Sequence, residues 1–157
     1  MNRQLKPKPL ADVFNKQKKL IKIEDKVENL KVNATVGLYY VLHLAHKPEV
    51  KWLLPEGIPP FKRDAGADIV PGLTPSNLYR ELRVLYLFLE GGHPTLKQLR
   101  REMLFVDLLE RLHGDEILMI ESLKDGTFKD KYRCPKKVVE LAFPGLLNEP
   151  FNPRFLK

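Results

Sequence analysis

The sequence has one cysteine among its 157 residues, Cys134, so an intramolecular disulfide is excluded. A protein without disulfides fits a reducing compartment and depends on packing for its stability. The length suffices for this, because a chain of about 150 residues buries roughly 68–70% of its unfolded surface. No histidine neighbours Cys134 to act as the base that a catalytic thiol needs, so we predict a small side chain that is buried or half-buried.

Long hydrophobic runs are also absent. No apolar stretch approaches the roughly 18 residues that span a bilayer. The N-terminal sequence MNRQLKPKPL lacks the hydrophobic region of a signal peptide. We therefore expect a soluble, intracellular protein that does not bind membranes.

The motifs of common catalytic and cofactor sites are missing as well. Gly91-Gly92 lacks the Lys-Ser/Thr of a nucleotide-binding loop, and the paired carboxylates have basic neighbours that explain them as solvated ion pairs. No cysteine or acidic cluster stands at metal-ligand spacing from the four histidines, His43, His46, His93 and His113. We predict no enzyme, no metal and no cofactor, with His43 as a core histidine making one hydrogen bond and His46 interacting with a helix dipole.

What the chain does have is positive charge at one end. Residues 1–33 hold nine Lys/Arg and four Asp/Glu, which gives +5 of the total formal charge of +7. Lys6-Pro7-Lys8-Pro9 cannot propagate a helix, so residues 1–9 are expected to form a basic extended arm. Lys136 and Lys137 form a second basic group.

Apolar residues at spacings of three and four predict an amphipathic helix over 10–31. Its lysines, Lys16, Lys19, Lys22 and Lys26, lie largely off the apolar stripe and predict a basic outer face. The nearly uncharged segment 34–46 predicts a central helix packed on several sides. Residues 48–54 predict one or two helical turns that carry Trp52, whose indole needs a hydrogen-bond partner.

A long loop is predicted over 55–75, where five prolines and three glycines interrupt regular structure, and its stretch 63–70 is expected to be mobile. Thr74-Pro75 then marks the start of a helix that runs to Glu90 and ends at Gly91-Gly92. Thr95 and Gln98 predict a capping box for a helix over 95–112, with Leu99, Met103 and Val106 among its core positions. The short connection between the two helices predicts an antiparallel hairpin.

Helices are predicted over 114–124, with Gly126 as its terminator, and over 135–143, with an extended stretch at 127–134 between them. The tail carries Phe151 and Phe155, which are expected to pack on the body or on a partner. The resulting fold is all-α, an irregular bundle of five or six helices around a central antiparallel helix hairpin. It divides into an arm at 1–9, one helical domain at 10–147 and an extended tail at 148–157.

Several short stretches carry a resemblance to a known family. They are Lys51-Trp52-Leu53-Leu54-Pro55-Glu56-Gly57, Glu90-Gly91-Gly92-His93-Pro94, Leu99-Arg100-Arg101-Glu102-Met103 and Ala142-Phe143-Pro144-Gly145-Leu146. Together they resemble a family of uncharacterised small proteins encoded by T4-like tailed bacteriophages and cyanophages, over about residues 45–147. The resemblance implies a phage origin and an all-helical domain, and it assigns no catalytic or binding residue.

These observations favour a non-enzymatic phage accessory protein, located in the host cytoplasm or associated with the virion. We expect it to bind a phage or host protein, within a larger assembly, through its tails and its basic N-terminal helix. The alternative is a sequence-nonspecific nucleic-acid-binding protein that uses the same lysines. The candidate contact residues are Arg3, Lys6, Lys8, Lys16, Lys19, Lys22, Phe151 and Phe155.

Overall fold

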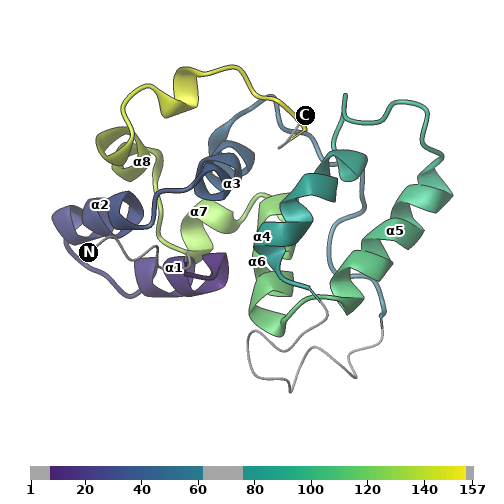
Figure 1. Cartoon of the computed structure of the whole chain (residues 1–157), viewed down its shortest axis with the longest axis horizontal. Coiled ribbons are helices and arrows are strands. Elements are labelled where there is room, and N and C mark those ends of the chain that lie inside the picture. Colours follow the sequence, from purple (N-terminus) through teal and green to yellow (C-terminus); the bar gives the residue numbers. More distant parts are fainter. Residues whose placement is uncertain (1–7, 62–75, 155–157) are drawn as a thin grey trace, which may run out of the picture.

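The computed structural model describes residues 8–61 and 76–154, and within these ranges the chain is an irregular bundle of helices (Figure 1). The predicted all-α fold is confirmed, with more and shorter helices than expected. Within these ranges, the β-structure consists of one isolated antiparallel bridge between Trp52 and Leu89. The helices are α1 (Leu10–Gln17), α2 (Ile23–Val32), α3 (Val36–His46), α4 (Leu78–Glu81), η1 (Leu82–Phe88, a 3-10 helix), α5 (Gln98–Glu110), α6 (Gly114–Asp125), α7 (Phe128–Lys131), α8 (Lys136–Ala142) and η2 (Leu146–Asn148, a 3-10 helix).

The predicted single helix over 10–31 is wrong, because α1 and α2 fold back on each other. The Asn29 side-chain amide donates to the backbone oxygen of Val13 at 3.1 Å and to Oε1 of Gln17 at 2.8 Å. In one continuous helix Val13 and Asn29 would lie about 24 Å apart. The turn buries Phe14 of α1 and Leu30 of α2 completely in the same core, which a straight helix would not allow.

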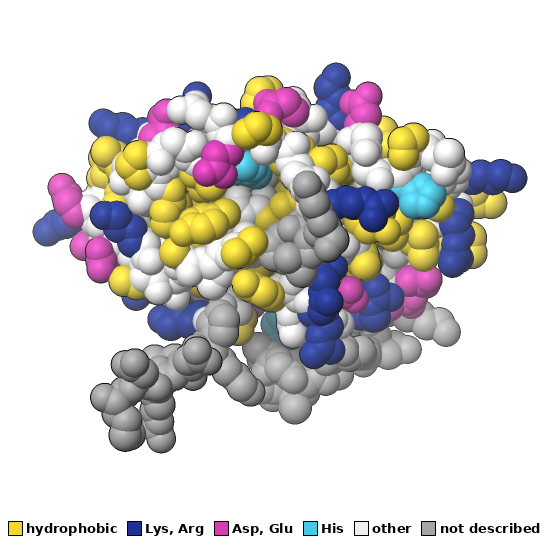
Figure 2. All heavy atoms as spheres, turned by 45° about the horizontal axis from the view of Figure 1, so that its top comes forward, with side chains coloured by type: hydrophobic (Ala, Val, Ile, Leu, Met, Phe, Trp, Pro, Cys, Tyr) yellow, Lys and Arg dark blue, Asp and Glu magenta, His cyan; other side chains and the backbone are white. Residues whose placement is uncertain are grey.

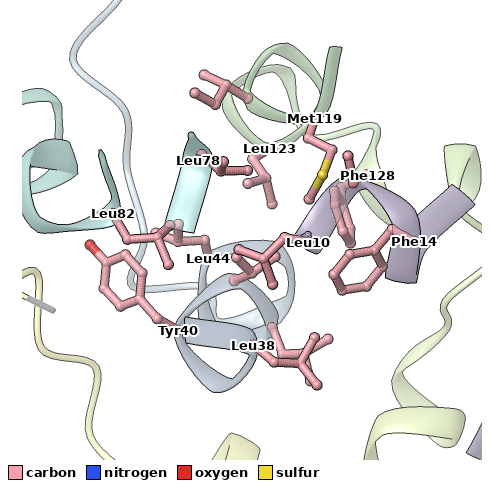
Figure 3. Packing of buried hydrophobic residues seen from close by; sticks show 14 of the residues in the cluster. Leu10, Phe14, Leu38, Tyr40, Leu44, Leu78, Leu82, Met119, Leu123 and Phe128 are labelled. Carbon is pink, nitrogen blue, oxygen red and sulfur yellow. The ribbon is translucent and has the colours of Figure 1, made fainter. Parts of the chain in front are cut away.

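The predicted central helix is confirmed as α3. Thr35 caps its N-terminus, accepting a hydrogen bond from the Leu38 amide at 3.1 Å. In Figure 3, Leu38 and Leu44 of α3 lie among core side chains of α1, α4, α6 and α7. His43 is the predicted core histidine, and its Nε2 lies 2.7 Å from the backbone oxygen of Leu146.

The predicted helical turns at 48–54 are wrong, since after a turn at 48–49 the backbone is extended. The Leu53 amide donates to the Phe88 oxygen at 2.8 Å, and the Glu90 amide donates to the Lys51 oxygen at 2.9 Å. This pairing satisfies the backbone where η1 ends, which helical turns at 48–54 would not do. The Trp52 indole nitrogen is buried without a hydrogen-bond partner among the described residues.

The predicted helix over 75–90 begins later and changes type. Asn77 caps α4, accepting from the Arg80 amide at 2.9 Å, and α4 tightens into η1. The predicted cap, Thr74, lies outside the described residues. The predicted mobile stretch 63–70 lies outside the described residues. After η1, Gly92 is required for close packing, because a Cβ there would stand 1.9 Å from the Tyr86 oxygen.

The second helix of the hairpin, α5, begins at Gln98, and the predicted capping box with Thr95 does not form. The Gln98 side-chain amide instead donates to the Leu53 oxygen at 2.8 Å, which ties α5 to the extended segment. The two arms of the hairpin lie in different places, because α4 lies near the middle of the bundle and α5 lies at its edge (Figure 1). A peripheral α5 leaves Leu99 and Met103, two predicted core positions, exposed.

The predicted helices at 114–124 and 135–143 are confirmed as α6 and α8, and Gly126 ends α6 with a φ of 78°. The predicted extended stretch at 127–134 is wrong, because it contains the short helix α7. Helical spacing brings Phe128 and Tyr132 onto one face, where their ring centroids lie 4.9 and 6.0 Å from that of Phe14. Cys134 follows as a fully buried side chain, as expected.

Candidate functional site

Two basic segments far apart in the sequence meet on the surface. The first is the α1–α2 turn, residues 16–22, with four lysines and no acidic residue. The second is residues 129–137, which run from α7 into α8 and hold five cationic residues and Asp130. The Tyr132 ring lies between them, with Lys18 Nζ 6.0 Å and Lys131 Nζ 5.7 Å from its centroid. We call residues 16–22 and 129–137 together the basic elbow surface.

Lys26 joins the two segments from the inside. Its Nζ donates to the backbone oxygen of Gln17 at 3.0 Å and to that of Arg133 at 2.9 Å, and the residue is 8% exposed. Burial lowers the pKa of this ammonium, and the nearby Arg133 cation lowers it further. The sequence prediction that Lys26 belongs to the outer basic face is therefore wrong.

The outer lysines of the elbow remain open to solvent. Lys16, Lys19 and Lys22 are exposed, and no residue of the basic elbow surface forms an ion pair within residues 8–61 and 76–154. Acidic side chains nevertheless stand close by in the sequence, with Glu24 and Asp25 in the exposed first turn of α2. Figure 2 shows basic and acidic side chains interspersed along its left edge, the side where α2 lies in Figure 1.

The pKa of His46 is affected by the cations of the second segment. Burial lowers its pKa to about 4, and the Lys129 and Lys136 cations contribute to the same shift. His46 is therefore neutral at neutral pH, so the predicted interaction with the helix dipole lacks the positive charge on which it depends. Lys129 and Lys136, both of the second segment, therefore lie close enough to the end of α3 to act on His46.

The structure places the remaining predicted contact residues in different situations. Arg3, Lys6 and Phe155 lie outside the described residues, and Lys8 is exposed just before α1. Phe151 packs on the body, where its ring stacks on Tyr40 with centroids 6.1 Å apart. The neighbouring Pro153 oxygen accepts a hydrogen bond from the Tyr40 hydroxyl at 2.6 Å, so this part of the tail is a structural strap.

Sequence reasoning identified the lysines but missed how they are assembled. The contribution of Lys131 and Arg133 depends on the α1–α2 turn and on the buried Lys26, and neither has a local signal in the sequence. One signal was present at α7, because Phe128 and Tyr132 stand at the i, i+4 spacing of a helix face.

A polar hollow of about 430 Å³ lies between α3, α6 and the extended segment. Two of its charged groups are held by the protein itself: Lys124 Nζ donates to the Pro55 oxygen at 2.7 Å and to Asp125 at 2.6 Å, and Asp125 accepts from the Gly57 amide at 3.1 Å. These contacts hold the extended segment on α6, so we assign the hollow a structural role. Among the described residues, no group of three or more potential metal-ligating side chains occurs.

Comparison with known proteins gives one match. A family model described as a family of unknown function (DUF6433) matches residues 12–130. No curated protein and no solved structure matches the chain. None of the helices in the described part of the chain combines the length and apolarity needed to cross a membrane.

Proposed function

The chain belongs to the DUF6433 family of unknown function, and we propose that it is a non-enzymatic binding protein whose basic elbow surface docks onto an acidic face of a protein partner. The observation that carries this proposal is the meeting of residues 16–22 and 129–137, whose cations make no ion pair within the described residues. Unpaired charge on a surface steers and selects an oppositely charged partner. We propose further that it is a phage accessory protein that binds a phage or host protein, within a larger assembly.

The alternative partner is a nucleic acid, and the charge pattern favours a protein instead. Glu24 and Asp25 lie two and three residues after Lys22 and are exposed, so the positive surface is interrupted. A duplex carries a phosphate charge about every 1.7 Å of its axis, and acidic side chains beside it are repelled. A protein surface can place its own cations opposite these carboxylates.

The test is affinity capture from infected cells with the full chain as bait. Replacing Lys18, Lys19 and Lys22 with alanine should reduce recovery of the captured protein about tenfold or more, since three favourable charge contacts are lost. Nuclease treatment should leave the recovery of that protein unchanged. A rise in salt should weaken capture, because screening shortens the reach of exposed charges.

A matched control removes the same charge elsewhere. Lys51, Arg80 and Arg83 are exposed and lie outside the basic elbow surface, so their triple alanine variant has the same net charge as the elbow variant. It should capture the partner as well as the parent does. Equal losses in both triple variants would contradict the proposal, and loss of capture on nuclease treatment would favour the nucleic-acid alternative.

A further inference from the structure

Helix α5 has two unlike faces. Its inner face buries Phe105 and Leu108 and also Arg101, whose guanidinium donates to the Leu87 oxygen at 2.9 Å. Its outer face carries Leu99, 74% exposed, and Met103, 51% exposed. Because side chains four residues apart share one helix face, these two form a continuous apolar stripe that Val106 extends. The helix lies at the edge of the bundle (Figure 1), so the stripe faces away from the core.

A groove runs along one side of this stripe. It has a volume of about 380 Å³ and lies between residues 54–60 and α5, with Met103 and Val106 on its helix wall and Ile58 and Pro59 opposite. The lining is largely apolar. The outer surface of α5 therefore combines a protruding apolar side chain, Leu99, with an apolar recess about one to two turns further along.

Two opposite charges stand on the other side of the stripe. Arg100 and Asp107 are exposed, and neither side chain makes an ion pair within the described residues. They are seven residues apart, which is close to two helical turns, so both project from the same side of α5. The positive charge precedes Met103 and the negative charge follows it by a similar distance.

We infer that the outer face of α5 binds the same face of a second copy of this chain, with the two helices antiparallel and a twofold axis near Met103. In that arrangement Arg100 of each copy faces Asp107 of the other, and Leu99 of each copy enters the groove of the other beside Val106. A twofold interface requires such self-complementarity. A parallel pairing is disfavoured, because it would place Arg100 against Arg100 and Asp107 against Asp107.

The arrangement is compatible with partner binding through the basic elbow surface. Helices α1 and α2 lie at the opposite end of the bundle from α5 (Figure 1). A dimer formed through α5 therefore carries two basic elbow surfaces, one at each of its two ends. Two linked binding surfaces raise the affinity for a repetitive partner through effective concentration.

Sedimentation velocity of the full chain, over about 1 to 300 µM, tests the dimer. A concentration-dependent shift from monomer to dimer is expected. Leu99→Asp should raise the dimer dissociation constant about tenfold or more, because a charge would enter an apolar groove. The matched control is Leu118→Asp on α6, where the parent leucine is 42% exposed, and this variant should dimerise as the parent does.

A charge exchange distinguishes this geometry from other dimers. Arg100→Glu alone and Asp107→Arg alone should each weaken self-association, since each variant places like charges opposite each other. Mixing the two variants should restore dimers, because both cross-contacts of the mixed dimer again join opposite charges. A chain that stays monomeric throughout, or a dimer insensitive to Leu99→Asp and to the charge variants, would overturn the inference.

Discussion

Replacing Lys26 with methionine is expected to lower the free energy of unfolding by about 3 kcal/mol, one of the two largest effects in this protein. The ammonium holds the backbone oxygens of Gln17 and Arg133 at 3.0 and 2.9 Å, and the side chain is buried. Methionine fills a similar volume but donates no hydrogen bond. Each acceptor left unsatisfied costs about 1–3 kcal/mol.

Urea unfolding followed by circular dichroism measures this loss, with Lys22→Met as the matched control. Lys22 is exposed and lies one turn earlier, so its replacement should change stability by less than about 0.5 kcal/mol. The Lys26 variant should also capture less partner, because the two halves of the basic elbow surface would no longer be fastened together. If the two variants were equally stable, Lys26 would not be what joins the two halves of the basic elbow surface.

Acid is expected to destabilise the protein through His46 by about 3 kcal/mol between pH 7 and pH 4. The pKa of His46 is about 4 in the folded chain, against an ordinary value of 6.5. Between these values the unfolded chain binds a proton that the folded chain does not, so stability falls as the pH falls. The difference of about 2.5 units corresponds to about 3 kcal/mol. Below pH 4 both states bind the proton, and the contribution becomes constant.

The measurement is the free energy of unfolding in urea at several pH values for the parent and for His46→Gln. The glutamine variant should lose most of the pH dependence in this window. Glu116 has the opposite effect on stability in both proteins. Burial raises its pKa, so the folded chain keeps a proton that the unfolded chain has lost, and stability falls as the pH rises. Its contribution cancels in the comparison. Parallel pH profiles for the two proteins would show that His46 titrates normally.

Much of the fold could be predicted because its signals are local. Helix α3 has both an uncharged sequence and Thr35 as its cap, and Gly126 supplies the left-handed residue that ends α6. Each signal acts within a few residues of the element that it sets. The predictions of α3, α6 and α8 were therefore correct to within a residue or two.

The errors occurred where distant contacts decide. The helix over 10–31 is divided because Asn29 reaches back to Val13 and Lys26 reaches forward to Arg133, and neither contact is visible in a helical pattern. The core positions of α5 were misassigned because Arg101 is buried by four hydrogen-bonding partners, which turns Leu99 outward. A hydrophobic pattern assigns the core positions of a helix to apolar side chains. A guanidinium whose hydrogen bonds are all satisfied can take such a position instead.

The candidate site shows the same division. The spacing of the apolar residues in the sequence predicted that Lys16, Lys19 and Lys22 would be exposed. Their proximity to Lys131 and Arg133 follows from tertiary structure alone. For Phe151 the sequence allowed packing on the body or on a partner, and in the structure its ring packs on Tyr40.

The central claim is that residues 16–22 and 129–137 form one surface of positive potential. Nuclear magnetic resonance tests it directly, by comparing how cationic and anionic nitroxides in solution relax each backbone amide. The anionic probe should be enriched at both segments, giving a higher potential there than along α5, and the Lys18, Lys19 and Lys22 triple alanine variant should lower it in both. A potential near zero or negative over the two segments would contradict the account.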